Sequence, residues 1–349
     1  MGHLAVGGPQ PEAAEKREYT LRWMRGALER MAAHDARFKR PLLYVLTNMR
    51  LWPDEENPEE PGFAQLKAFA GAKLDVLGDA AEVEIYAALE LGPKLDGVCA
   101  DVENVHPRQD VHAGLAAAAS DGDAAFKLLI AAHALDPGFQ AKAAAAFGRA
   151  GGTGAGKPPA VKGFMRMLAK LGTDHADADE PKPYENADTN RVAWVLEDAE
   201  QLIKAEAEAR AELGIPIRCK NNYQKSFDAR LTKGYRAMLC NYVYDPKQTW
   251  GELESEVAAA AAEVKQLVLG VFAGMGVPED GLAMLGAGID AVAAEFGGAE
   301  MRASPARLVV EIQFMTKEYY AMRKKTHAWY KVVRSDHAAG MMTDYFGGL

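Results

Sequence analysis

Two polar side chains, Glu311 and Gln313, lie in a segment whose other residues are typical of a buried strand. Apolar residues alternate along 308–315, so a strand would place Glu311 and Gln313 together on the opposite face. A carboxylate beside an amide can help to hold a metal ion and the phosphate bound to it. The simpler alternative is a sheet face that is covered by an amphipathic helix.

The hydrophobic period changes after Thr316 from that of a strand to that of a helix. One predicted helix stripe is cationic and partly aromatic, and it contains Tyr320, Lys324, His327, Lys331 and Arg334. The more apolar stripe contains Tyr319, Met322, Thr326, Trp329 and Val333. We expect the cationic stripe to face the polar side of the strand, which would suit a metal-bound phosphate and an adjacent ring.

A strongly basic segment spans residues 215–236, in a chain whose net charge is -9. Its single acid is Asp228, and its cations are Arg218, Lys220, Lys225, Arg230, Lys233 and Arg236. Exposed cations normally alternate with acids, so a cluster of one sign beside glycine and asparagine residues indicates a polyanion site. An ordinary solvated loop is the alternative.

Further candidates precede this segment. Residues 161–171 are predicted to form a short helix with Lys162 and Lys170 on one side. Asp188 and Arg191 lie at the start of a predicted strand, where Asp188 could equally be a turn residue. Residues 151–159, with sequence GGTGAGKPP, fit the spacing of a phosphate-binding loop but lack its hydroxyl residue and its following helix, so we interpret them as a linker.

In this order, the motifs resemble those of the RelA/SpoT-type (p)ppGpp synthetase domain over about residues 160–334. They are a basic helix, a D-x-x-R strand, a basic loop ending in G-Y-R, and an E-I-Q-x-x-T strand followed by a histidine and an aromatic-Tyr-Lys ending. The sequence departs from the family pattern in three ways. Met315 stands in place of an arginine, Asn186 in place of the usual magnesium aspartate, and the first helix lacks its serine.

The resemblance implies Mg²⁺-dependent transfer of pyrophosphate from ATP to the 3′-hydroxyl group of GDP or GTP. It implies that Asp188 and Glu311 are metal-binding or general-base carboxylates. The nucleotide-binding residues that it implies are Lys162, Lys170, Arg218 and Lys220 at the donor phosphates, Tyr235 against the acceptor base, Gln313, His327 and Lys331 on the acceptor side, and Arg191 and Arg236. It also implies that strand 237–244 is a neighbour of strand 308–315.

The fold that we predict is α+β, with a mixed β-sheet flanked by helices, nucleotidyltransferase-like, and preceded by an all-helical N-terminal domain. Asp136-Pro137-Gly138 predicts a stop between helices at 115–135 and 139–147, and Gly78 predicts a break in a helix over 63–91. The predicted divisions are a tail at 1–16, a helical domain at 17–150, the linker at 151–159, and a synthetase-like domain at 160–340 with a helical insertion at 246–305.

Composition excludes several classes of protein. The chain of 349 residues is 49% hydrophobic and 26% charged, which is typical of globular proteins. Its acidic balance argues against a general nucleic-acid-binding role, and no apolar run predicts a membrane span. Three widely spaced cysteines argue against a disulfide framework or a structural zinc site and favour a reducing, cytoplasmic environment, with an organelle left open.

Two other functions remain open from the sequence. One is a catalytically inactive domain that binds nucleotide or RNA as a regulator. The other is a structural or interaction protein whose alanine-rich helices bind a protein partner or a second copy of the chain.

Overall fold

The computed structural model describes residues 61–104, 115, 121–152, 161–164, 167, 182–274 and 277–334. The chain divides into two compact units, one of Met1–Lys73 with Trp329–Met341 and the other of Leu74–Ala328 with Met342–Leu349. The second unit contains the sheet and the candidate site. The predicted tail at 1–16 and most of the linker at 151–159 lie outside the described residues.

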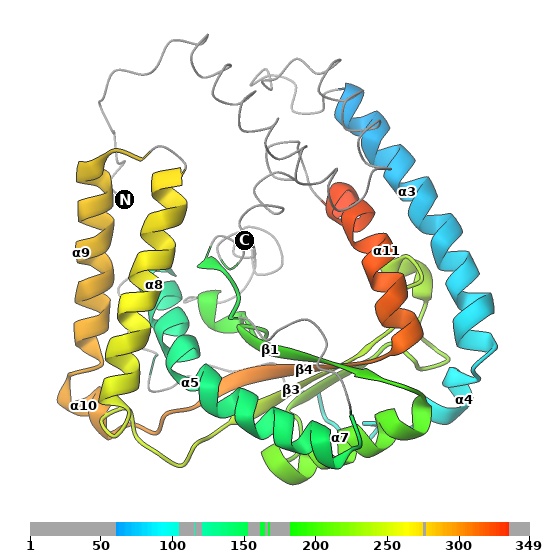
Figure 1. Ribbon diagram of the computed structural model, residues 1–349, viewed down its shortest axis with the longest axis horizontal. Helices are drawn as coiled ribbons and strands as arrows, with labels where there is room; N and C mark the ends of the chain where they lie inside the picture. Colours follow the sequence, from blue (N-terminus) through cyan, green and yellow to red (C-terminus); the bar gives the residue numbers. More distant parts are fainter. Residues whose placement is uncertain are drawn as a thin grey trace. The chain divides into compact units, whose positions relative to one another are not determined.

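A four-stranded mixed sheet forms the centre of the second unit (Figure 1). The order of its strands is β1-β4-β3-β2. β1 pairs with β4 in parallel, whereas β3 pairs with β4 and β2 pairs with β3 in antiparallel fashion. The strands are Asn190–Leu196 (β1), Arg218–Asn221 (β2), Met238–Tyr244 (β3) and Leu308–Thr316 (β4). The prediction of an α+β protein with a mixed sheet is confirmed, and so is the adjacency of the strands at 237–244 and 308–315.

One face of the sheet is apolar and is covered by α5 (Asp121–Arg149) and α7 (Ala199–Leu213) (Figure 1). The Trp194 ring lies edge-on to Phe314, with centroids 5.1 Å apart, and also packs against Phe147 of α5 at 5.3 Å. The alternating apolar residues of β4 are fully buried, because each points into this layer. Asp198 caps the first turn of α7 by accepting a hydrogen bond from the Gln201 backbone N–H.

Helix α5 continues through Pro137, so the predicted stop at Asp136-Pro137-Gly138 is wrong. Proline removes one backbone donor from the helix and crowds the carbonyl groups of the preceding turn. The side-chain amide of Asn190, on β1, donates a hydrogen bond of 2.9 Å to the Ala132 carbonyl in that turn. Pro137 removes the helix donor of the His133 carbonyl, whereas the Asn190 bond anchors the neighbouring turn to β1. Packing of α5 against β1 and α7 accounts for a helix that continues through the proline.

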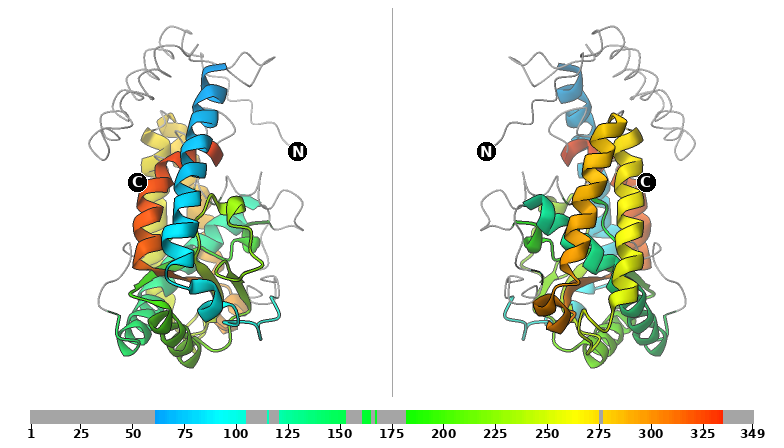
Figure 2. Two further views of the ribbon diagram at one scale, coloured as in Figure 1. Left: turned by 90° about the vertical axis from the view of Figure 1, so that its right-hand side faces the viewer. Right: turned by 90° about the vertical axis from the view of Figure 1, so that its left-hand side faces the viewer.

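Helices α8 (Glu254–Gly274), α9 (Glu279–Glu295) and α10 (Ala299–Ala303) occupy the segment predicted as a helical insertion. α8 and α9 lie side by side (Figure 2), and both pack against α5. Through this packing α5 shares one compact unit with the sheet. α5, which belongs to the predicted helical domain at 17–150, thus lies in the same compact unit as the sheet of the predicted domain at 160–340.

Helix α3 (Pro61–Ala81) runs without a break through Gly78 and leads into a π-helical turn at Glu82–Ala87 (η2) and then α4 (Leu91–Leu95). A Cβ atom on Gly78 would lie 2.8 Å from the Lys233 carbonyl oxygen, so this glycine permits close contact with a loop. The predicted break at Gly78 is wrong, because this glycine makes room for the loop and does not bend the helix. None of the described helices is both long and apolar enough to cross a membrane.

Candidate functional site

The second face of the sheet carries a row of polar side chains that crosses all four strands. Glu311 on β4 lies directly opposite Arg191 on β1 and Asn241 on β3, and Asn241 lies opposite Arg218 on β2. Residues that are directly opposite in a sheet point to the same face. The structure thus places a carboxylate and a carboxamide between two guanidinium groups. An anion bound beside a metal ion fits such a row.

A chain of hydrogen bonds orients Glu311. Its Oε1 accepts a bond of 2.6 Å from the Gln313 amide, and Arg323 Nη1 donates one of 2.9 Å to Gln313 Oε1. Glu311 and Gln313 are each 9% exposed, so water competes little for these bonds. The predicted pairing of Glu311 with Gln313 on one face is confirmed. The sequence analysis missed Arg323, whose position ten residues after Gln313 becomes meaningful only once α11 (Lys317–Arg334) folds back over the strand.

Asp188 lies in the turn before β1, where Lys162 Nζ contacts its Oδ1 at 2.6 Å and Arg191 Nη1 is 3.9 Å from its Oδ2. The side chain of Lys162 is 2% exposed, which makes this a largely buried ion pair. Asn241 connects the turn to the polar row, because its amide donates a 3.0 Å hydrogen bond to the Ala187 carbonyl. The predicted residues Lys162, Asp188 and Arg191 are therefore gathered at the same edge of β1.

Tyr235 packs beside the polar face rather than standing free in solvent. Its hydroxyl group lies 3.8 Å from the Met315 sulfur, and the Arg323 guanidinium is 5.9 Å from its ring centroid. Burial raises the pKa of Tyr235 above its ordinary value. A flat, half-buried ring next to a cation can stack against a planar base.

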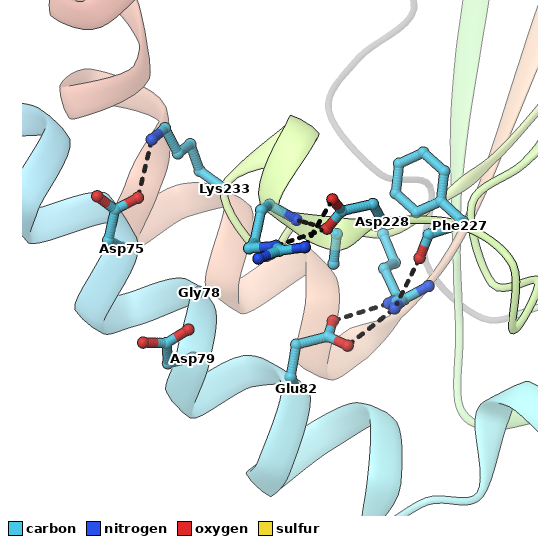
Figure 3. A pocket seen from close by; sticks show the side chains of 11 residues that line it. Asp75, Gly78, Asp79, Glu82, Phe227, Asp228 and Lys233 are labelled. Atoms are coloured by element: carbon cyan, nitrogen blue, oxygen red, sulfur yellow. Dashed lines mark hydrogen bonds and ion pairs between the residues drawn. The ribbon is translucent and has the colours of Figure 1, made fainter.

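Arg230, Lys233 and Arg236, which are three of the six cations of the basic segment at 215–236, pair with acids in this structure. Lys233 pairs with Asp75 of α3 at 2.8 Å, and Arg230 pairs with Asp228 at 3.0 Å (Figure 3). The pocket drawn in Figure 3 lies between the basic segment and residues 75–82, and both walls carry charge. Local sequence predicted a polyanion site here, but acids that are distant in the sequence neutralise part of its charge.

Arg236 is held in place by several contacts at once. Two of its nitrogens contact the two carboxylate oxygens of Glu82 at 2.8 Å each, and a third donates a 2.6 Å bond to the Asn222 carbonyl. The guanidinium also lies 3.8 Å from the Tyr86 ring centroid, and the residue is 3% exposed. This placement favours a structural role for Arg236 over the predicted contact with a nucleotide.

The remaining predicted site residues differ in whether they lie at the polar face of the sheet. Arg218 belongs to the polar row, and Lys220 is exposed two residues further along the same face of β2. His327 is exposed on α11, whereas Tyr319, Met322 and Thr326 of the predicted apolar stripe are buried. Arg323, which lies outside the predicted cationic stripe, contacts the polar face of the sheet. Lys170 and the side chain of Lys331 lie outside the described residues.

Comparison with known proteins does not assign the chain to a family. No protein-family model matches the chain, and no curated protein or solved structure matches it.

Proposed function

We propose that the chain is a RelA/SpoT-like nucleotide pyrophosphokinase that transfers pyrophosphate from ATP to the 3′-hydroxyl group of GDP or GTP with Mg²⁺. The observation that carries the proposal is the oriented carboxylate of Glu311 in a row with Arg191, Asn241 and Arg218. Phosphoryl-type transfer depends mainly on positioning and charge stabilisation, so cations around one fixed carboxylate are the needed components.

Glu311 would contribute to this reaction in one of two ways. In the first, Glu311 would be a ligand of Mg²⁺, which proteins commonly hold through one or two carboxylates together with substrate phosphates. Alternatively it accepts the proton of the attacking hydroxyl group. Gln313 and Arg323 hold its carboxylate in one orientation in both cases. Arg191 and Arg218 would stabilise the charge that develops on the transferred phosphates.

The test is incubation of the purified chain with Mg²⁺, labelled ATP and GDP or GTP, and chromatography of the products. We expect a 3′-pyrophosphorylated nucleotide, and we expect Glu311→Gln to lower its rate of formation by about 10²–10⁴-fold. Glu300→Gln, on the exposed surface of α10, is the matched control and should retain the wild-type rate. Product formation that is equal in the Glu311→Gln variant would contradict the proposed role.

A second candidate, a nucleotide-binding regulator without catalysis, is favoured by the state of Asp188. Lys162 and Arg191 both face this carboxylate, and cations at those positions oppose the binding of a metal ion. This candidate predicts that ATP or GTP raises the melting temperature equally with and without Mg²⁺, and that no product forms. An unchanged melting temperature with every nucleotide would exclude both candidates and favour the structural or interaction role.

A further inference from the structure

Three cysteines that are far apart in the sequence meet in the second unit. Their sulfur atoms all lie within 4.8 Å of one another. Cys99 Sγ is 3.7 Å from Cys240 Sγ, and Cys240 Sγ is 3.2 Å from Cys219 Sγ. All three residues are buried. Their spacing in the sequence argued against a zinc site, but the fold brings together the donor set that the spacing does not reveal.

The distances fit a shared metal ion better than a covalent bond. Zn–S bonds of about 2.3 Å at tetrahedral angles place two sulfur ligands about 3.8 Å apart. A disulfide requires about 2.05 Å, which is far shorter than the separation of 3.2 Å between Cys219 and Cys240. Three converging sulfurs are also more than one disulfide can use.

The backbone holds Cys99 over the other two cysteines at a conformational cost. Cys219 and Cys240 are directly opposite on β2 and β3. Cys99 lies in a turn after α4 with φ of 62°, in the left-handed region that side chains rarely adopt. Such strain persists only where the surrounding contacts fix the conformation.

Two asparagines supply those contacts between the segment that contains Cys99 and strand β2. The Asn221 amide donates hydrogen bonds of 2.8 Å and 3.1 Å to the carbonyls of Leu95 and Val98. Asn104 Oδ1 accepts one of 2.7 Å from the Cys219 backbone N–H. The segment that contains Cys99 is thereby fastened to the edge strand.

Charged groups next to the cluster suit a metal–thiolate centre. Glu206 Oε1 lies 3.3 Å from Cys99 Sγ, and Arg210 forms an ion pair with the same carboxylate. Arg210 also contacts both carboxylate oxygens of Asp101, at 2.6 Å and 2.9 Å. A guanidinium at this position offsets part of the negative charge that three thiolates and a carboxylate would bring to a divalent cation.

We propose that Cys99, Cys219 and Cys240 bind one Zn²⁺ ion as thiolates, with Glu206 as the nearest protein group for the fourth position. The ion would join the turn at Cys99 to β2 and β3 and so serve a structural role. Cys99 and Cys219 line a pocket at the surface, which gives the ion a path to the cluster. The proposal does not depend on the nucleotide chemistry of the polar face.

The test uses the full chain, purified without chelators. Elemental analysis should find about one zinc per chain. After removal of zinc, added Co²⁺ should give the ultraviolet charge-transfer bands of thiolate ligands and the visible bands of a tetrahedral ion. Thiol reagents should modify the cysteines slowly in the zinc-loaded protein and rapidly after a chelator is added.

Variants separate the ligands from their neighbours. Cys99→Ala should abolish stoichiometric zinc, and Glu206→Gln should weaken Co²⁺ binding by about 10–100-fold. Met238, whose sulfur lies 3.8 Å from Cys99 Sγ, provides the matched control, because Met238→Leu conserves volume and should retain the metal.

The wild-type measurements remain decisive if a cysteine variant fails to fold. Three reactive thiols with no zinc and no Co²⁺ bands would overturn the proposal. So would an intact mass that is lowered by two hydrogens, which would indicate a disulfide. Copper in place of zinc, unaffected by Glu206→Gln, would overturn the assignment of both the ion and its fourth ligand.

Discussion

Replacing Arg236 by methionine tests whether the basic segment has a structural role. The side chain is 4% exposed and contacts Glu82 through two nitrogens at 2.8 Å each. Removing one partner of a buried ion pair costs about 3–5 kcal/mol, because the other charge loses its compensation. The side chain of Glu82 is 32% exposed and can recover some hydration, which favours the low end of that range.

The loss of the Asn222 hydrogen bond adds about 1 kcal/mol. We therefore expect Arg236→Met to lower the free energy of unfolding by about 4 kcal/mol, and the melting temperature by about 10 °C. The assay is urea denaturation followed by tryptophan fluorescence, together with a thermal melt by circular dichroism.

Arg230 provides the matched control within the same segment. Its side chain is 89% exposed and pairs with the surface residue Asp228. Arg230→Met should change the free energy of unfolding by less than about 1 kcal/mol. A double-mutant cycle with Glu82→Gln should give a coupling energy of about 1–3 kcal/mol for the Arg236–Glu82 pair.

Equal effects of the Arg236 and Arg230 substitutions would refute this reasoning. A different refutation would be normal stability of Arg236→Met combined with loss of nucleotide binding. That outcome would restore the nucleotide contact that the sequence predicted for Arg236.

Three further predictions concern the elements around the sheet. Gly78→Ala should destabilise the protein by about 1–3 kcal/mol in urea denaturation, because its Cβ would lie 2.8 Å from a loop carbonyl oxygen. Gly71→Ala is the control, since nothing lies within 4 Å of its Cβ, and it should be neutral or stabilising. Asn190→Ala should lower the free energy of unfolding by about 1–3 kcal/mol through loss of its bond to the Ala132 carbonyl, and an unchanged urea midpoint would contradict that role. Burial raises the pKa of the Asp136 carboxyl group in the folded state. Its contribution to the free energy of unfolding is therefore fully present below the unfolded-state pKa near 3.9 and is lost as the pH rises through the folded-state pKa. The wild type should therefore lose stability relative to Asp136→Asn as the pH rises above about 4, and a difference that is constant with pH would be inconsistent with this shift.

The strand prediction for β4 succeeded because its signal is local. Alternation of Leu308, Val310, Ile312 and Phe314 fixes which side of the strand is buried, whatever the strand packs against. The same alternation places Glu311 and Gln313 on one face, so the centre of the candidate site was predictable from the sequence.

The helix stop predicted at Pro137 failed because α5 packs against elements that are distant in the sequence. A proline in isolation ends or kinks a helix, but β1 and α7 cover α5, and Asn190 of β1 anchors the turn before Pro137 by donating to the Ala132 carbonyl. Local sequence carries no information about that donor. The same holds for Gly78, whose missing side chain permits a contact with a loop rather than a bend.

The pairing of charges and the grouping of the three cysteines depended even more on tertiary structure. The sequence by itself determined the composition of the basic segment, the alternation of the strands and the two stripes of α11. Only the tertiary structure brought Glu82 to Arg236 and Arg323 to Gln313, and only it gathered Cys99, Cys219 and Cys240. The physical reason is that Coulomb and coordination interactions act over a few ångströms in space. Hydrophobic period is a property of neighbouring residues, whereas the partner of a charge or a thiol is chosen by the fold.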